Sequence, residues 1–301
     1  MPFYIAISPW LIGFVFMSLL PLIIGFLTSL TNYDGLDPDY RWIGMSNYRT
    51  ILGDKDAWWG LYRTAVMTVF TVPLAVIGGF LLATLLNQRV KALGFFRTAF
   101  YLPSIMPVVV MALMFRFLFD RDGGPVNALI SLFRPGTAVA WLSSDGCMIV
   151  LVVMALWGMI GGGMVIYLAG LQGIPAELKE AAALDGAGAW RIFRHITVPL
   201  MTPVLFFQLI MGVIGALQTF AQPLLLTPTP AGGTAFGAVP PRSNYLFVIH
   251  AYNQIFAFNR FGYGTALLWV LFLVVLLFTL VLFKSGAYWV HYEVDQEGKG
   301  K

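Results

Sequence analysis

Residues Gln172 to Pro203 read QGIPAELKEAAALDGAGAWRIFRHITVPLMTP. This stretch is the only long charged segment between two apolar runs that could each cross a bilayer. Pro175 suits the first turn of a helix, strong helix formers follow it, and Gly186 is a typical helix stop. A second helical pattern starts at Gly188 and covers Trp190 to Ile196. The stretch therefore predicts two short helices joined by a glycine turn and lying outside the membrane.

The first of these two helices carries a surface suited to docking. The side chains of Ala181 to Ala183 are small, so the backbone of another protein can approach them closely. Glu177, Glu180 and Asp185 provide acceptors for a basic partner. The alternative is an ordinary solvated connection between two spans.

The composition places the chain among membrane proteins. Of its 301 residues 59% are hydrophobic and 11% are charged, and the mean hydropathy is +0.80. The net charge of +4 is spread over flanking segments and forms no patch for a nucleic acid. The single cysteine, Cys147, has no disulfide partner, and the three histidines lack the spacing of a metal site. Neither metal nor redox chemistry is indicated.

Apolar runs predict an all-α integral membrane protein with six transmembrane helices, forming one transmembrane domain over residues 1–301. Pro9 and Pro21 should kink the first helix. Six spans place both termini on the same side of the membrane. The spans are expected at residues 3–30, 61–86, 95–119, 148–171, 198–226 and 265–283, with the docking loop at 172–197.

The remaining connections are polar or too short to cross. Thr31 to Gly60 is expected to be a loop on one membrane face, with aromatic residues at the interface. Val126 to Phe133 should lie flat on the surface, and Asn244 to Phe258 should form an amphipathic helix in an external loop.

The fifth span offers the clearest candidate for a solute pathway. At 100° per residue its small and polar residues share one face. That face comprises Gln208, Gly212, Gly215, Gln218, Thr219 and Gln222. It could bind solute hydroxyls near the middle of the membrane, or it could pack helices together through glycines and interhelical amide bonds. Sequence alone leaves both interpretations open.

Two further spans contribute candidates. In the fourth span a glycine cluster that includes Gly161 and Gly162 should loosen the helix, and Trp157 beside it could stack on a sugar or simply pack. In the second span Thr64, Thr68 and Thr71 share a face. They could line a path, although threonines in membrane helices more often bond their own backbone.

The docking loop resembles the EAA loop of the permease subunits in binding-protein-dependent ABC importers. The matching residues are Glu180, Ala181, Ala182, Asp185, Gly186, Ala187, Phe193, Ile196, Pro199 and Pro203. Four more segments are similar to the sugar-permease branch of the maltose and glycerol-3-phosphate type, so that the resemblance covers nearly the whole chain. These segments are Gly44 to Leu52, Phe96 to Asp120, Leu168 to Pro175 and Phe261 to Ala266.

This resemblance implies a type I importer permease fold in the cytoplasmic membrane of a prokaryote, with the EAA loop and the C-terminus in the cytoplasm. It implies that Glu180, Ala181, Ala182, Asp185, Gly186 and Ala187 couple the permease to its ATPase. It also places the substrate site on the fourth and fifth spans, where Ala155, Met159 and Gly162 replace polar residues of some members. The implied partners are a second permease, two ATP-binding subunits, an extracytoplasmic solute-binding protein and a sugar-like substrate.

The orientation and the start of the chain depend on two further features of the sequence. The 18 Lys and Arg residues divide evenly between the two predicted faces, so orientation depends on the basic Asn87 to Arg97 segment and on the resemblance. Such permeases usually have a charged tail before the first span, so the start is expected to be trimmed or short.

The energy source is expected to lie in a partner. The chain has no GxxxxGK[ST] loop, so it is not expected to bind ATP in the usual way. It has no acidic residue inside a predicted span, which argues against a proton- or ion-coupled carrier. We expect it to have no cofactor of its own and not to be an enzyme by itself. The alternative is a self-sufficient secondary carrier or channel. The solute itself, a sugar, a polyol or glycerol-3-phosphate, stays open.

Overall fold

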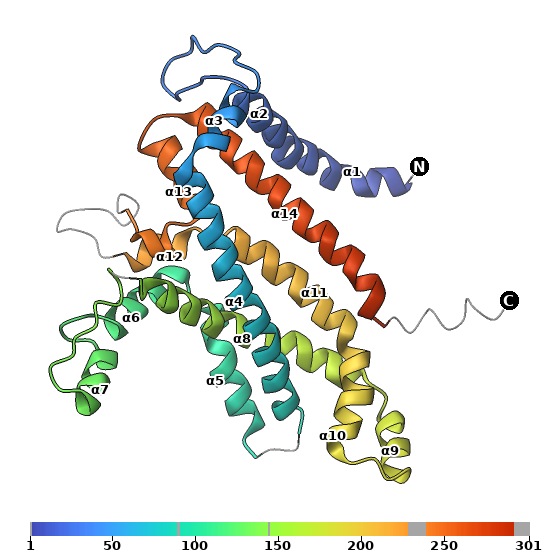
Figure 1. Cartoon of the computed structure of the whole chain (residues 1–301). Coiled ribbons are helices and arrows are strands. Elements are labelled where there is room, and N and C mark those ends of the chain that lie inside the picture. Colours follow the sequence, from blue (N-terminus) through green and yellow to red (C-terminus); the bar gives the residue numbers. More distant parts are fainter. Residues whose placement is uncertain (1, 89–90, 144, 228–238, 292–301) are drawn as a thin grey trace. The chain divides into compact units, whose positions relative to one another are not determined.

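The computed structural model describes residues 2–88, 91–143, 145–227 and 239–291, and within them the chain is almost entirely helical (Figure 1). Extended chain pairs in these ranges only at an isolated bridge between Thr31 and Trp42. Five helices are long and apolar enough to cross a membrane, and a bent pair makes a sixth if it counts as one span. The predicted all-α architecture is confirmed, and the described residues contain five candidate spans, or six when the bent pair is counted.

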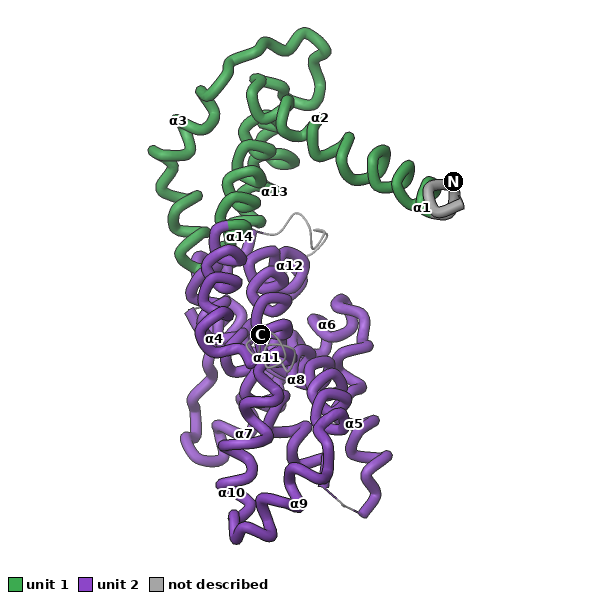
Figure 2. Tube along the Cα trace, turned by 90° about the vertical axis from the view of Figure 1, so that its right-hand side faces the viewer, with its two compact units in different colours: residues 1–63, 245–276 green, residues 64–244, 277–301 purple. Residues whose placement is uncertain are grey.

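Contacts between Cα atoms divide the chain into two compact units, residues 1–63 with 245–276 and residues 64–244 with 277–301 (Figure 2). The single domain expected from the sequence stays a prediction. In chain order the elements are α1 (Pro2–Phe14), η1 (Val15–Leu19), α2 (Leu20–Ser29), α3 (Ser46–Gly53), α4 (Lys55–Leu86), α5 (Leu93–Ile105), α6 (Val108–Leu118), α7 (Pro125–Phe133), α8 (Cys147–Gly173), α9 (Ala176–Leu184), α10 (Ala189–Ile192), η2 (Phe193–Thr197), α11 (Val198–Leu217), α12 (Ala221–Leu226), η4 (Arg242–Asn244), α13 (Phe247–Phe256) and α14 (Phe261–Trp289).

Two of the spans contain a π-helical turn just before a proline. The amide of Leu20 bonds to the carbonyl of Val15, and the amide of Val198 bonds to the carbonyl of Phe193. Each donor immediately precedes a proline, which has no amide hydrogen and whose ring crowds the preceding turn. The wider turn makes room for that ring. In the first span this irregularity accompanies Pro21, whereas Pro9 lies inside α1.

The second and sixth spans are longer than predicted. α4 begins at Lys55 rather than at residue 61, because Oδ1 of Asp54 accepts the amides of Asp56 and Ala57 at 2.9 and 3.1 Å and caps the helix. α14 covers Phe261–Trp289 rather than 265–283.

Asp54 also bonds to side chains of α13 and α14 within the first unit. Its Oδ2 accepts the hydroxyl of Tyr263 at 2.5 Å and lies 3.0 Å from Nε2 of His250 on α13. Burial pushes the pKa of this carboxyl upward, but the bonds from Tyr263 and from the Ala57 amide, with the charge of His250, outweigh burial and hold the pKa below its ordinary value. The amphipathic helix predicted within Asn244 to Phe258 is α13, and Phe247 and Ala251 on its inner face belong to the apolar core.

The third span is not the straight helix expected at residues 95–119. It consists of α5 and α6, which meet at an angle of 100°. Met106 and Pro107 are both extended at the junction. A proline disfavours helical geometry in the residue before it, so Pro107 forces this break, whereas Pro103 is tolerated inside α5.

The fifth span is also not one helix over residues 198–226. α11 ends at Leu217, the chain turns through Gln218 to Phe220, and α12 starts at Ala221. Pro223 explains the break, because in a continuous helix its missing amide would leave the carbonyl of Thr219 unpaired. With the restart at Ala221, the proline falls in a first turn, where a missing donor costs little.

Candidate functional site

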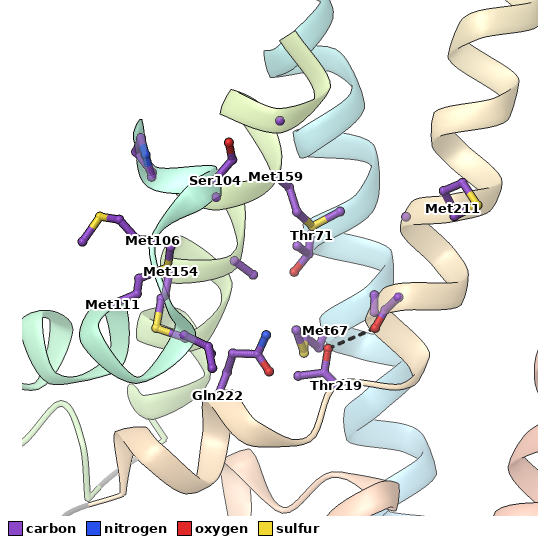
Figure 3. Close-up of a pocket in the computed structure, with 18 of the residues that line it drawn as sticks. Met67, Thr71, Ser104, Met106, Met111, Met154, Met159, Met211, Thr219 and Gln222 are labelled. Carbon is purple, nitrogen blue, oxygen red and sulfur yellow. Dashed lines mark hydrogen bonds between the residues drawn. The ribbon is translucent and has the colours of Figure 1, made fainter. Parts of the chain in front are cut away.

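A cavity of about 590 Å³ lies in the second unit, among α4, α8, α11 and the bent pair of α5 and α6 (Figure 3). The stretch from α11 into α12 completes its wall. None of the described residues that line the cavity is Asp, Glu, Lys, Arg or His. The cavity can therefore offer hydrogen bonds and apolar contacts to a guest molecule but no formal charge.

Five polar side chains, from α4, α5, α11, the α11–α12 turn and α12, face this cavity: Thr71, Ser104, Gln208, Thr219 and Gln222. Within the described chain, the amides of Gln208 and Gln222 make no hydrogen bond, so both are available to a guest. Gln218, which the helical periodicity grouped with them, is exposed and lies outside the lining. The break after Leu217 separates it from the others.

The glycine cluster of α8 does not loosen the helix as the sequence suggested. α8 runs unbroken from Cys147 to Gly173. Gly161 instead permits close packing, because a Cβ there would overlap the carbonyl oxygen of Phe100 on α5. Gly158 and Gly162 line the cavity, where the missing side chains leave space for a guest. Small residues that let membrane helices approach are a general packing device.

Trp157 lies outside the cavity lining, although it was a candidate platform for a sugar. Its ring packs against Phe115 of α6, with 5.8 Å between the ring centroids. Gly162 therefore lines the cavity and Trp157 does not, although the two residues are close together in the sequence.

Methionines make up much of the apolar lining. Six of the 13 methionines in the chain contribute to it: Met67, Met106, Met111, Met154, Met159 and Met211. They come from α4, the α5–α6 junction, α6, α8 and α11, and are scattered in the sequence. Their flexible thioethers can adapt to guests of different shape. Sequence periodicity gave no signal for this gathering.

The predicted docking loop forms a short helix with a glycine-terminated end. α9 ends at Leu184, and Gly186 has a φ of +79°, the left-handed conformation expected for it. The amide of Gly186 bonds to the carbonyl of Ala183 at 3.1 Å, and that of Ala187 bonds to Ala182 at 2.9 Å. These two bonds form a Schellman motif, which closes the helix and sets the direction of the chain leaving it.

The outer face of α9 is available for a partner. Glu180 and Ala181 are exposed and Ala182 is half-buried. Leu184 is 90% exposed, which the sequence analysis did not single out. A leucine so exposed on a polar loop is a candidate contact residue.

The second helix of the loop continues into the fifth span instead of forming a separate element. α10, η2 and α11 make one helical run, Ala189–Leu217, which is long enough to be a span by itself. Phe193 in this run stacks on Phe80 of α4 and on Trp190, with centroid distances of 5.8 and 5.5 Å. The docking loop is therefore joined directly to the helix that carries Gln208 into the cavity.

The sequence of residues 75–288 matches the family described as the inner membrane component of binding-protein-dependent transport systems. The chain belongs to this family. It is thus a multi-pass permease of the inner membrane and a transport component rather than an enzyme.

Individual relatives cover the permease from end to end. It is 34% identical over 297 residues to the probable ABC transporter permease protein YesP of Bacillus subtilis, covering 98% of this chain and 93% of that protein. It is 30% identical to the arabinooligosaccharides transport system permease protein AraP of the same organism, with 95% and 88% covered. It is also 30% identical to the trehalose/maltose transport system permease protein MalF of Thermococcus litoralis, with 95% and 93% covered.

A solved structure of similar fold is a chain of a bacterial ABC transporter involved in the import of the acidic polysaccharide alginate. The TM-score is 0.81 at 20% identity, and the match covers 95% of the permease and 94% of that chain. A bacterial alginate ABC transporter in complex with a periplasmic protein that carries an alginate pentasaccharide matches with a TM-score of 0.80 at 19% identity, covering 94% and 93%. Both confirm the predicted importer permease fold.

Proposed function

We propose that this permease translocates a saccharide through the cavity between α4, α8 and α11. The observation that carries the proposal is the convergence of five uncharged polar side chains on a cavity of about 590 Å³ inside a bundle of membrane-spanning helices. Ser104 and Thr219 bond to their own backbone, but Thr71, Gln208 and Gln222 make no side-chain bond within the described chain, and solute hydroxyls can supply one. Relatives named for arabinooligosaccharides and for trehalose and maltose support a saccharide as the solute.

The lining suits both the hydroxyl groups and the apolar C–H surface of a sugar ring. Gln208 and Gln222 have free amides that can donate to and accept from hydroxyls, each bond contributing about 0.5–1.5 kcal/mol. The methionine thioethers can pack against the apolar C–H surface of the ring. A second permease subunit, which the resemblance of the docking loop implies, would complete the site.

In this proposal α9 couples the permease to ATP hydrolysis by its partner subunits. Two ATP-binding subunits would dock on the exposed face of α9, with Glu180 accepting from a basic residue and the small side chains of Ala181 and Ala182 allowing close approach. The turn after α9, which contains Asp185, Gly186 and Ala187, sets the direction of α9 relative to α10. Because α10 continues into α11, a movement of the loop would reach Gln208 through one helical run. ATP-driven closure would thereby alternate access to the cavity.

The polar segments of the first unit are the proposed seat of the solute-binding protein. These are the Thr31 to Gly60 connection, with α3, and the exposed side of α13. We propose that the α9 loop and the C-terminus lie in the cytoplasm, and the basic Asn87 to Arg97 segment supports this orientation.

A reconstitution experiment tests the function. The permease is purified with its second permease and ATP-binding subunits, placed in proteoliposomes with the solute-binding protein, and assayed for uptake of maltose, trehalose and arabinotriose. ATP-dependent uptake of at least one of these saccharides is the expected result. Equal uptake by the permease alone without ATP would instead establish the secondary carrier or channel. The absence of an ionisable group among the described lining residues argues against proton coupling.

A further inference from the structure

Thr71 on α4 is a buried hydroxyl whose side chain has no partner. It is 0% exposed, and its Oγ1 makes no hydrogen bond within the described chain. It also belongs to the lining of the saccharide cavity, where it borders the same open region as Thr219 and Gln222 (Figure 3). A buried polar group without a partner is uncommon in a folded protein and calls for an explanation.

Other threonines in the helices of this chain satisfy their hydroxyls with their own backbone. Thr68, one turn before Thr71, donates to the carbonyl of Thr64 at 2.8 Å. Thr84 donates to Phe80 at 2.8 Å, further along the same helix. This bond to the carbonyl four residues earlier is the usual choice of a threonine in a membrane helix. Thr71 does not make it with Met67, so its hydroxyl is left for another partner.

Close packing of α4 on α11 lies beside Thr71. Val72, the next residue, lies against Gly212 of α11, where an added Cβ would be only 3.0 Å from Cγ1 of Val72. A Cβ at residue 212 would therefore crowd Val72, and this close approach brings α11, with Gln208 of the lining, next to the face of α4 that carries Thr71.

We propose that the Thr71 hydroxyl binds a hydroxyl of the transported saccharide and is a specificity-determining residue of the permease. The proposal rests on the function proposed above. A saccharide hydroxyl can both donate to and accept from Oγ1. The bond would form only while solute occupies the cavity, so it favours the loaded state of the pathway.

The test uses Thr71→Val, which keeps the shape of the side chain and removes the hydroxyl. In the reconstituted complex, uptake at saturating binding protein should fall about three- to tenfold, the effect of one hydrogen bond. ATP hydrolysis stimulated by the binding protein should persist. Thr71→Ser retains the hydroxyl and should restore most of the uptake. Thr68→Val is the matched control, because the Thr68 hydroxyl is already bonded inside its own helix.

Thermal unfolding of the purified complex without saccharide separates binding from a structural role. Thr71→Val should unfold at the same temperature as the wild type or higher, since it removes an unpartnered buried hydroxyl. Unchanged uptake in Thr71→Val, or a loss of uptake together with a lower unfolding temperature, would overturn the proposal. A wild-type complex that imports none of the three saccharides would instead refute the proposed function on which it rests.

Discussion

The amide of Ala187 bonds to the carbonyl of Ala182 at 2.9 Å, across Gly186 in its left-handed conformation. This bond closes α9 and determines the angle at which the chain enters α10. Only glycine adopts such a backbone without strain. The orientation of α9 relative to α10 thus depends on Gly186.

Substitution of Gly186 should uncouple the permease from its ATPase. Gly186→Ala forces a left-handed alanine, at a cost of about 1–2 kcal/mol, and Gly186→Val should cost more. Both should reach the membrane, yet transport should fall strongly in Gly186→Val and less in Gly186→Ala. Gly188→Ala is the control, because Gly188 has a φ of −68° and open space where a Cβ would lie. Normal uptake in Gly186→Val would contradict a coupling role for this turn.

The charge of Glu180 should matter for association with the ATP-binding subunits. Glu180→Lys places a cation where the proposed partner has one, so we expect at least a tenfold loss of affinity, measured as ATPase retained during purification of the complex. Glu180→Gln removes the charge without adding repulsion and should have an intermediate effect. If the loop is merely solvated, both variants will retain the ATPase and transport normally.

The two free amides of the cavity should contribute to uptake, whereas the exposed glutamine should not. Gln208→Leu combined with Gln222→Leu removes two groups able to bond the solute, at about 1 kcal/mol each, so uptake should fall at least tenfold. Gln218→Leu should stay within about twofold of the wild type, because Gln218 lies outside the lining. If the double variant assembles and transports normally, the two amides do not bind the solute and serve helix packing instead.

The proposed orientation can be tested with membrane-impermeant thiol reagents. Cys147 is the only cysteine of the chain and is fully buried, so the wild type should not react. Asp37→Cys, in an exposed turn of the loop before α3, should react from outside the cell. Gln172→Cys, near the start of the docking loop, should react only after the cytoplasmic face is opened. The opposite pattern would invert the topology.

Features that depend on neighbouring residues alone could be predicted from the sequence. The end of α9 is set by the backbone freedom of Gly186, and the long spans are set by runs of apolar residues that need no distant partner. The helical face that exposes Glu180, our proposed docking surface, was predictable for the same reason, because one short helix presents it. Its Leu184 was visible in the sequence but not distinguishable from a buried leucine.

The cavity was decided by tertiary structure, because segments distant in sequence meet there. Helical periodicity placed Gln218 and Gln222 on one face, yet Pro223 broke the helix and left only Gln222 in the lining. Thr68 and Thr71 share a face of α4, but one hydroxyl bonds its own backbone and the other borders the cavity. Side-chain rotation and the approach of other helices decide between these outcomes, and neither is encoded in the local spacing of residues.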